Sequence, residues 1–294
     1  MIQAAEKYPD VQFCHATGTQ AHTKNLKNFH NAFASIYEGR YLAGIAAGMK
    51  LNAMIKEGKF EAKDAKIGYV GAFPYAEVKS GYTAFFLGVR SVCKEATMEV
   101  QFTGSWYDEA KEKEAATLLI GRGCKLISQH ADSMGAPTAC ESAGVPNVSY
   151  NGSTLDACPN TFIVSSRINW VPYMKYMIEC VRDNKAIDTD WCKGINEGAV
   201  ELTPINEKVA APGTAEAIKA AEEQFKAGTL HVFDTSTFTV GGKTLTSYMA
   251  DVDTDEKFTP DTEVVSNGYF HESEKRSAPY FDVNIDGITL LNEG

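Results

Sequence analysis

Polar and aromatic residues follow short apolar stretches at four places in the middle of this sequence, at the point where each stretch ends. They are Phe73, Tyr75 and Glu77 after the first stretch, Ser105 and Trp106 after the second, Asp132 and Ser133 after the third, and Asn151 and Ser153 after the fourth. Aromatic rings stack on flat ligands, and carboxylate, hydroxyl and amide groups hydrogen-bond to polar ligand atoms. These residue types therefore predict a ligand-binding site.

Several of these residues also have a structural interpretation. Asp132 or Ser133 could simply be the N-cap of the helix that follows, and the two roles weigh equally. Trp106 could pack over the start of its helix, and a first-turn glutamate such as Glu77 stabilises a helix through its charge. Asp108 is better explained as a helix cap. The residues alone leave these alternatives open.

The apolar stretches belong to a strand and helix pattern that repeats between Lys66 and Tyr150. Its units read KIGYVGAFPYAEV, VQFTGSWYDEAKEKEAATLLIGRG and KLISQHADSMGAPTACESAGV, and VPNVSYNG supplies a fourth strand. Parallel strands need a crossover helix and are buried on both faces, so the pattern predicts an α/β fold with a parallel sheet. Ligands of open α/β sheets bind outside the carboxyl ends of the strands, where the candidate residues lie.

The flanking parts of the chain are assigned by the same periodicity and turn rules. We expect a polar loop at 19–28, a helix at about 32–56, a strand at 160–168, a helix at 169–186, a strand pair or extended return segment at 191–206, a helix at 214–230, a hairpin around Gly241 and Gly242, and extended surface structure from 253 onward. Arg40 is a single charge in an apolar helical stretch. It either reaches water at the surface or points into a cleft.

Composition narrows the classes of protein to consider. The chain has 294 residues, 44% apolar and 22% charged, which is a normal globular mixture and long enough for two domains. A net charge of -10 without a dense lysine cluster argues against nucleic acid as a partner. No stretch is long and apolar enough to span a membrane. The chain opens as if in the middle of a helix, so we expect missing upstream sequence.

Signatures of metal sites and enzymes are weak. The seven cysteines include no CxxC and no paired Cys/His spacing, which argues against zinc, and most of them are expected to be reduced and buried. GxSxG, HExxH, GxxxxGK[ST] and GxGxxG motifs are absent. A hydrolase using His130 and Asp132 is conceivable, but no nucleophile is marked out. We therefore expect no catalytic residues, no metal and no cofactor.

Several segments together resemble one protein family. YEGRYLAGIAAGM, KIGYVGAFPYAEV, GSWYDEAKEKEAATLLIGRG, SQHADS and KGINEGAVELTPIN are similar to the basic membrane protein family, the PnrA-like substrate-binding lipoproteins of ABC transporters. The similarity runs from about Lys7 to Phe233. It is strongest to a branch with a GSW tryptophan and a QHxDS segment, whose members are associated with purine bases or nucleosides.

The resemblance implies a periplasmic-binding-protein-like fold of two Rossmann-like lobes joined by a hinge. Residues 66–170 would form lobe 2, and 1–65 with 171–294 would form lobe 1, incomplete at its N-terminus because family members carry a lipoprotein signal and further units upstream. In the family's motifs, Asp132 and Ser133 match QHxDS, Trp106 matches GSW, and Tyr75 with Glu77 matches FPxxEV. Trp170 matches an aromatic residue of the return helix. Phe73, Asn151 and Arg40 complete the predicted ligand-binding set.

The predicted function is that of the substrate-binding component of an ABC importer for a purine base or nucleoside. The protein would be extracytoplasmic, lipid-anchored at full length and monomeric, and its partners would be the ligand and a membrane permease. Closure of two lobes around the ligand would be the signal that the permease reads. The alternatives are a sensor domain of the same fold for a sugar or amino-acid derivative, and a small-molecule enzyme on a doubly wound fold.

Overall fold

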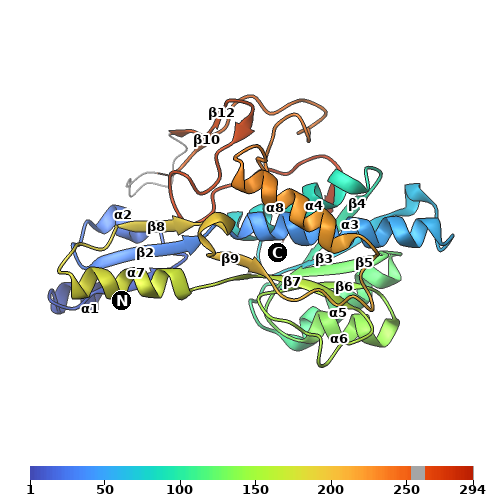
Figure 1. The fold of residues 1–294 in the computed structure, drawn as a ribbon, viewed down its shortest axis with the longest axis horizontal. Helices are drawn as coiled ribbons and strands as arrows, with labels where there is room; N and C mark the ends of the chain where they lie inside the picture. Colours follow the sequence, from blue (N-terminus) through green and yellow to red (C-terminus); the bar gives the residue numbers. More distant parts are fainter. Residues whose placement is uncertain (253–261, 294) are drawn as a thin grey trace.

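The computed structural model describes residues 1–252 and 262–293 and contains two separate main sheets (Figure 1). Among the described residues, seven strands form one sheet in the order β14-β4-β3-β5-β6-β7-β9, and three form another in the order β1-β2-β8. Two further pairs of short strands lie in the C-terminal part of the chain. The two main sheets are the frame to which the candidate residues are attached.

The large sheet contains the repeated units predicted from the sequence. Its central strands are β3 (Lys66–Gly71), β4 (Thr97–Phe102), β5 (Leu126–His130), β6 (Asn147–Tyr150) and β7 (Phe162–Ile168), and all of them pair in parallel. β14 (Ile288–Leu290) adds in parallel beside β4, and β9 (Val200–Leu202) adds antiparallel to β7. The prediction of an α/β fold with a parallel sheet is confirmed.

Helices cover both faces of the large sheet (Figure 1). α3 (Ile36–Lys56), α4 (Ala76–Val92) and α8 (Thr214–Lys226) lie on one face, and α5 (Glu109–Gly121) and α6 (Gly135–Ala143) lie on the other. Leu42, Phe85 and Val100 belong to the core on the first side, whereas Leu119 and Ala136 belong to the core on the second. Burial on both faces explains why the strands read as almost continuous apolar runs.

The small sheet consists of three parallel strands, β1 (Phe13–Ala16), β2 (Phe29–Ala34) and β8 (Asp190–Lys193). The helices α1 (Ile2–Lys7), α2 (Gln20–Lys24) and α7 (Val171–Arg182) belong to this part of the chain. α7 buries Tyr173 and Cys180 but exposes Ile178 to 67% and Val181 to 61%. Within the described residues, β1 pairs only with β2, so its outer edge is open.

The C-terminal part of the chain packs on the core. It contains β10 (Met249–Ala250), β11 (Thr262–Glu263), β12 (Val265–Ser266), β13 (Tyr269–Phe270) and β14. Phe270 and Phe281 are buried in the main core, and the Ser277 backbone N–H donates to Asp190 of β8 at 2.8 Å. The prediction of extended surface structure is therefore right about the lack of helix in the described residues 262–293 but wrong about their surface position, and 253–261 lie outside the described part.

Two other local predictions need correction, and a third is narrowed to one of its alternatives. The helix expected from about residue 32 begins at Ile36, because 29–34 form the fully buried strand β2. Of the two alternatives for 191–206, the strand pair is excluded and the extended return segment remains, since β8 and β9 belong to different sheets and are separated by the 3₁₀ turn η2 (Ile195–Glu197). The loop at 19–28 contains α2. A second 3₁₀ turn, η1 (Ala62–Asp64), precedes β3.

Several turn and cap predictions are confirmed. Gly144, a typical helix-ending residue in MGAPTACESAG, follows α6 in the left-handed conformation, with φ 67°. Asp108 caps α5 by accepting the Lys111 backbone N–H at 3.0 Å. Val240 and Lys243 form an antiparallel bridge across the predicted Gly241 and Gly242 turn.

The large sheet includes strands from outside the range predicted for lobe 2. β9 and β14 lie in the large sheet although their residues fall outside 66–170, and α3 packs against α4 of that range. The ranges proposed for the lobes stay a prediction.

The seven cysteines are all unpaired in the described structure. No helix among the described residues combines the length and apolar character needed to cross a bilayer.

α3 and α4 approach each other through glycine. A Cβ at Gly44 would collide with the carbonyl oxygen of Phe85, and one at Gly88 with that of Tyr41. We predict that Gly44→Ala lowers the free energy of unfolding by about 2–3 kcal/mol through overpacking. Gly121→Ala, at the end of α5 with nothing within 4 Å, should stay within about 1 kcal/mol of wild type. Urea unfolding measures both, and equal effects of the two changes would contradict the close approach.

A buried carboxyl group at the start of α3 makes stability depend on pH. Burial raises the pKa of Glu38 from 4.5 to about 7, against the lowering effect of the Ile195 N–H, and Glu197 raises it further. The folded state therefore favours the protonated group. The contribution of protonated Glu38 to the free energy of unfolding is complete below about pH 4.5. It is lost as the pH rises through 7, and the loss amounts to up to about 3 kcal/mol.

We predict that Glu38→Gln, which keeps a neutral acceptor for Ile195, removes most of this loss. Urea unfolding at pH 4.5 and pH 8 should show a smaller decrease in unfolding free energy for the variant than for wild type. The exposed Glu114→Gln should behave like wild type. An unchanged pH dependence in Glu38→Gln would disprove the assignment.

Candidate functional site

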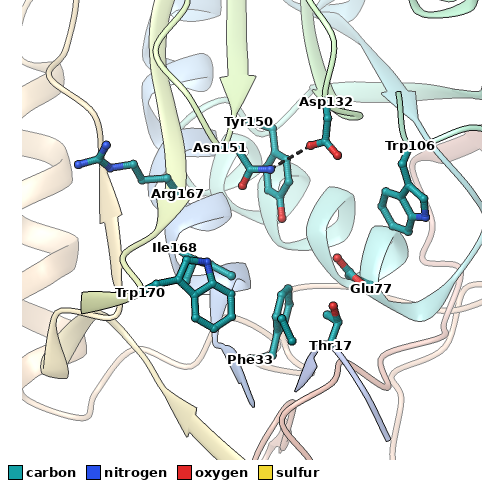
Figure 2. A pocket seen from close by; sticks show the side chains of 11 residues that line it. Thr17, Phe33, Glu77, Trp106, Asp132, Tyr150, Asn151, Arg167, Ile168 and Trp170 are labelled. Carbon is teal, nitrogen blue, oxygen red and sulfur yellow. Dashed lines mark hydrogen bonds between the residues drawn. The ribbon is translucent and has the colours of Figure 1, made fainter. Parts of the chain in front are cut away.

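A cavity of about 660 Å³ lies where the carboxyl ends of the large sheet face the small sheet (Figure 2). It is lined by Ala16, Thr17, Phe33, Glu77, Trp106, Asp132, Tyr150, Asn151, Arg167, Ile168 and Trp170. The large-sheet side supplies the first turn of α4, the exits of β4, β5 and β6, and the end of β7. The small-sheet side supplies the end of β1, β2 and the start of α7. This is the position expected for a ligand site in an α/β fold.

Five of the residues predicted from the sequence line the cavity: Glu77, Trp106, Asp132, Asn151 and Trp170. They come from five different places in the chain. The parallel strands bring four of these places together, because each strand delivers its exit to the same edge of the sheet. The fifth, Trp170, is the N-cap of α7.

Asp132 and Asn151 form the polar centre of the site. The Asn151 side-chain Nδ2 donates to Asp132 Oδ1 at 2.9 Å (Figure 2). The Asp132 backbone N–H donates to the carbonyl of Trp106 at 2.9 Å, which ties the exits of β4 and β5 together. Asp132 Oδ2 and Asn151 Oδ1 are the remaining side-chain oxygens of the pair, and both are acceptors.

Phe73 and Tyr75 support the cavity from outside. Their rings stack with centroids 5.0 Å apart and 13° between planes, and Phe73 meets Trp106 edge-on at 5.6 Å. Tyr75 is 55% exposed. The pair thus fixes the orientation of Trp106, and neither ring belongs to the lining.

Ser133 is buried next to Asp132 and takes part in local backbone contacts. Its N–H donates to the Glu112 carboxylate at 3.2 Å, and its Oγ accepts the Gly135 N–H at 3.1 Å, at the start of α6. The N-cap of α6 is Met134, without a side-chain capping bond, so Ser133 forms a turn before the helix and does not cap it.

Arg40 lies beneath the site, completely buried. Its guanidinium donates to the Tyr69 hydroxyl at 3.0 Å and the Ser128 hydroxyl at 2.7 Å, and it lies 5.5 Å from the ring centroid of Tyr150. It neither reaches water nor lines the cavity, so neither role considered from the sequence describes it. It touches the cavity only through Tyr150.

Tyr150 presents a neutral hydroxyl. Burial raises its pKa well above 10, and the nearby carboxylates of Glu77 and Asp132 add to the effect while Arg40 opposes it. A neutral phenol can both donate and accept a hydrogen bond. Tyr150 therefore adds a donor to a site otherwise rich in acceptors.

Arg167 is the cation of the lining, and it already has a partner. Its Nε donates to Glu201 at 2.7 Å. The pairing of β7 with β9 places these residues opposite each other. The charge of Arg167 is thus largely balanced from within the protein.

The lining also contains residues that were not predicted from the sequence: Ala16, Thr17, Phe33, Tyr150, Arg167 and Ile168. Phe33 fell within the helix expected at about 32–56, so it was not recognised as a residue of a strand that ends at the cavity. Tyr150 directly precedes Asn151 and would have been found by including the last residue of each strand. Thr17 is the residue directly after β1 (Phe13–Ala16). Applying the rule of strand exits to this strand as well would have found it. No cluster of His, Cys, Asp or Glu suited to a metal ion occurs in the described parts of the chain.

The chain matches known proteins over most of its length. The model of the PnrA-like ABC transporter substrate-binding proteins, the Bmp family, matches residues 1–232. The chain belongs to this family. The Bmp family is one of substrate-binding proteins and not of enzymes.

Two curated relatives share more than a quarter of their residues with this Bmp-family chain. A putative ABC transporter glucose-binding protein of Haloferax volcanii is 33% identical over 239 residues, 81% of this chain and 57% of that protein. A purine-binding protein of Brucella abortus is 30% identical over 226 residues, 75% of this chain and 60% of that protein. The chain thus spans less than two thirds of the length of these relatives.

A solved structure shows the same architecture. An ABC transporter solute-binding protein from Aeropyrum pernix K1 superimposes with a TM-score of 0.67 at 16% identity, covering 79% of this chain and 72% of that one. The likeness confirms the predicted periplasmic-binding-protein-like fold of this Bmp-family chain.

Asn151 holds its amide toward Asp132 from a left-handed backbone conformation, with φ 63°. Asparagine and glycine tolerate this conformation, whereas alanine is strained in it. We predict that Asn151→Ala lowers the free energy of unfolding by about 1–2 kcal/mol more than Asn151→Gly, because both variants lose the amide and only one is strained. Urea unfolding measures the difference. A glycine variant as unstable as the alanine variant would show that the conformation is not needed.

Proposed function

We propose that this chain binds a purine base or nucleoside as the substrate-binding component of an ABC importer. The observation that carries the proposal is the combination, in one cavity, of aromatic rings on both sides with a cluster of hydrogen-bond acceptors at its polar centre. A purine offers the matching chemistry, namely a flat aromatic ring with N–H donors on its edge.

The aromatic side chains come from both parts of the molecule. Trp106 lies on the large-sheet side, and Phe33 and Trp170 lie opposite it (Figure 2). Phe33 and Trp170 also contact each other, with centroids 6.4 Å apart. A flat ligand between these rings would be held by stacking, which contributes about 1–3 kcal/mol for a nucleobase on an aromatic side chain.

The acceptors match the donors of a purine nucleoside. Asp132 Oδ2 and Asn151 Oδ1 face the donors of a base, such as an exocyclic amino group or a ring N–H. Glu77 is a further acceptor, suited to a ribose hydroxyl. Glu201 offsets the charge of Arg167, so a phosphate would meet the carboxylates of Glu77 and Asp132 with little net positive charge beside them. The electrostatics thus favour bases and nucleosides over nucleotides.

The relatives support the same class of ligand and supply a rival. One relative is called a purine-binding protein and another a putative glucose-binding protein. Glucose also stacks on tryptophan and donates hydroxyl groups to carboxylates, so it is the ligand to test against purines. The sensor alternative would use the same site without a transporter.

Transport would follow from closure. A ligand that touches both sides of the cavity stabilises the closed arrangement in proportion to its contacts with that state. The permease would then recognise the closed, monomeric protein on the extracytoplasmic side of the membrane.

We predict that adenine, adenosine, guanosine or inosine raises the melting temperature of the purified chain. A ligand at 100 times its Kd stabilises by about 2.7 kcal/mol, a shift of several degrees. Asp132→Ala should abolish the shift because it removes the central acceptor. The exposed Asp156→Ala is the matched control and should respond like wild type.

Two results would contradict the proposal. Stabilisation by glucose with no response to any of the four purines would assign the site to sugars. An unchanged purine response in Asp132→Ala would show that the ligand binds elsewhere on the chain.

A further inference from the structure

His130 is a buried polar residue without a hydrogen-bond partner. It ends β5, is 0% exposed, and both ring nitrogens lack a partner in the described structure. A neutral imidazole carries one N–H donor and one acceptor. Leaving such a group buried and unpaired destabilises the folded state, so its presence needs an explanation.

The ring lies directly behind three side chains of the cavity lining. Its Nε2 is 3.8 Å from Glu77 Oε1, its centroid is 4.1 Å from that of Tyr150, and Trp106 lies 6.2 Å away. His130 does not line the cavity itself. Any effect on a ligand must therefore pass through one of these neighbours.

The fold leaves space for this ring. A Cβ at Gly81 would lie 2.5 Å from His130 Nδ1, so only glycine fits at that position of α4. Glu77 lies one turn earlier on the same helix. Nδ1 thus faces the helix backbone at Gly81, while Nε2 faces the carboxylate.

We propose that His130 is a positioning residue of the binding site: its Nε2–H donates to the Glu77 carboxylate when a ligand fills the cavity, and this bond directs the other carboxylate oxygen to the ligand. The inference rests on the proposed function. It assigns His130 a role in specificity for donor-bearing ligands.

Loss of water explains why the bond depends on the ligand. The Glu77 side chain is 23% exposed, so water solvates its carboxylate in the open cavity. A ligand that covers the carboxylate removes that water, and the group then needs donors from within the site. His130 Nε2–H is the buried donor beside it, and a small rotation of the Glu77 side chain closes 3.8 Å to hydrogen-bond distance.

Other charged and titratable groups around the ring do not offer the same contact. Tyr150 packs its ring, rather than its hydroxyl, on the imidazole. Arg40 is on α3 and lies over the Tyr150 ring at 5.5 Å. Asp132 follows two residues later and is bonded to Asn151. Glu77 is thus the acceptor that the geometry offers to Nε2.

The test is a double-mutant cycle on the whole chain, read as the Kd of adenosine by calorimetry. His130→Phe keeps a planar ring without donors and should weaken binding about ten-fold. His130→Gln places an amide nitrogen near the Nε2 position and should stay within about three-fold of wild type. In a Glu77→Ala background, the penalty of His130→Phe should disappear. Melting temperatures without ligand verify that each variant folds.

A spectroscopic signature separates positioning from packing. In ¹⁵N-histidine-labelled protein without ligand, His130 should be the Nε2–H tautomer. Its Nε2–H resonance should move downfield on adding adenosine, and Glu77→Ala should abolish the movement. An Nδ1–H tautomer, or an equal penalty of His130→Phe with and without Glu77, would overturn the inference while leaving the proposed function intact.

Failure of the proposed function gives a different result. If adenosine, adenine, guanosine and inosine all fail to bind the wild-type chain, the purine assignment fails and the ligand-dependent role of His130 fails with it. The tautomer measured without ligand still reports whether Nε2–H faces Glu77.

Discussion

The buried guanidinium of Arg40 is the interaction on which the binding edge of the large sheet depends. It donates to the Ser149 carbonyl at 3.2 Å, the Ser166 hydroxyl at 3.3 Å, the Tyr69 hydroxyl at 3.0 Å and the Ser128 hydroxyl at 2.7 Å. These partners belong to β6, β7, β3 and β5, which are neighbours in the sheet. One side chain of α3 therefore ties together the four strands whose exits carry most of the site.

An arginine is suited to this place because its donors form a planar fork that reaches several acceptors at once. The faces of Phe85, Tyr69 and Tyr150 surround the cation at 4.9, 5.4 and 5.5 Å, and they offset part of the cost of removing it from water. α3 approaches the sheet closely at Gly39, where a Cβ would lie 2.7 Å from Val200 and 3.2 Å from Ser166, and this brings the helix near enough for Arg40 to bond. The alignment of the strand exits thus depends on the close packing of α3.

The site residues that could be predicted from the sequence are those whose position depends on the local order of strands and helices. Glu77, Trp106, Asp132 and Asn151 were found because they follow periodic apolar strands, and parallel topology then brings such exits together. Arg40 was misjudged because a lone charge in an apolar helix carries no signal of its four partners, which lie up to 126 residues away. The burial of the C-terminal segment could not be predicted for the same reason. Its buried aromatic residues do not recur at a helical or strand spacing. Its strand β14 pairs with β4, which is far away in the sequence.

Most polar groups of the cavity lie on one side, whereas aromatic groups lie on both, with Trp106 on the large-sheet side. Glu77, Asp132, Asn151 and Arg167 belong to the large-sheet side, whereas Ala16, Phe33 and Trp170 belong to the small-sheet side, with Thr17 as its polar member. Hydrogen bonds are directional and select among ligands, whereas apolar contact tolerates small changes of angle. In the proposed function, the rigid edge held by Arg40 would therefore recognise the ligand, and the small-sheet side would close over its ring. A ligand lacking the matching donors would leave buried carboxylates unpaired on closure, and this cost would oppose the closed state.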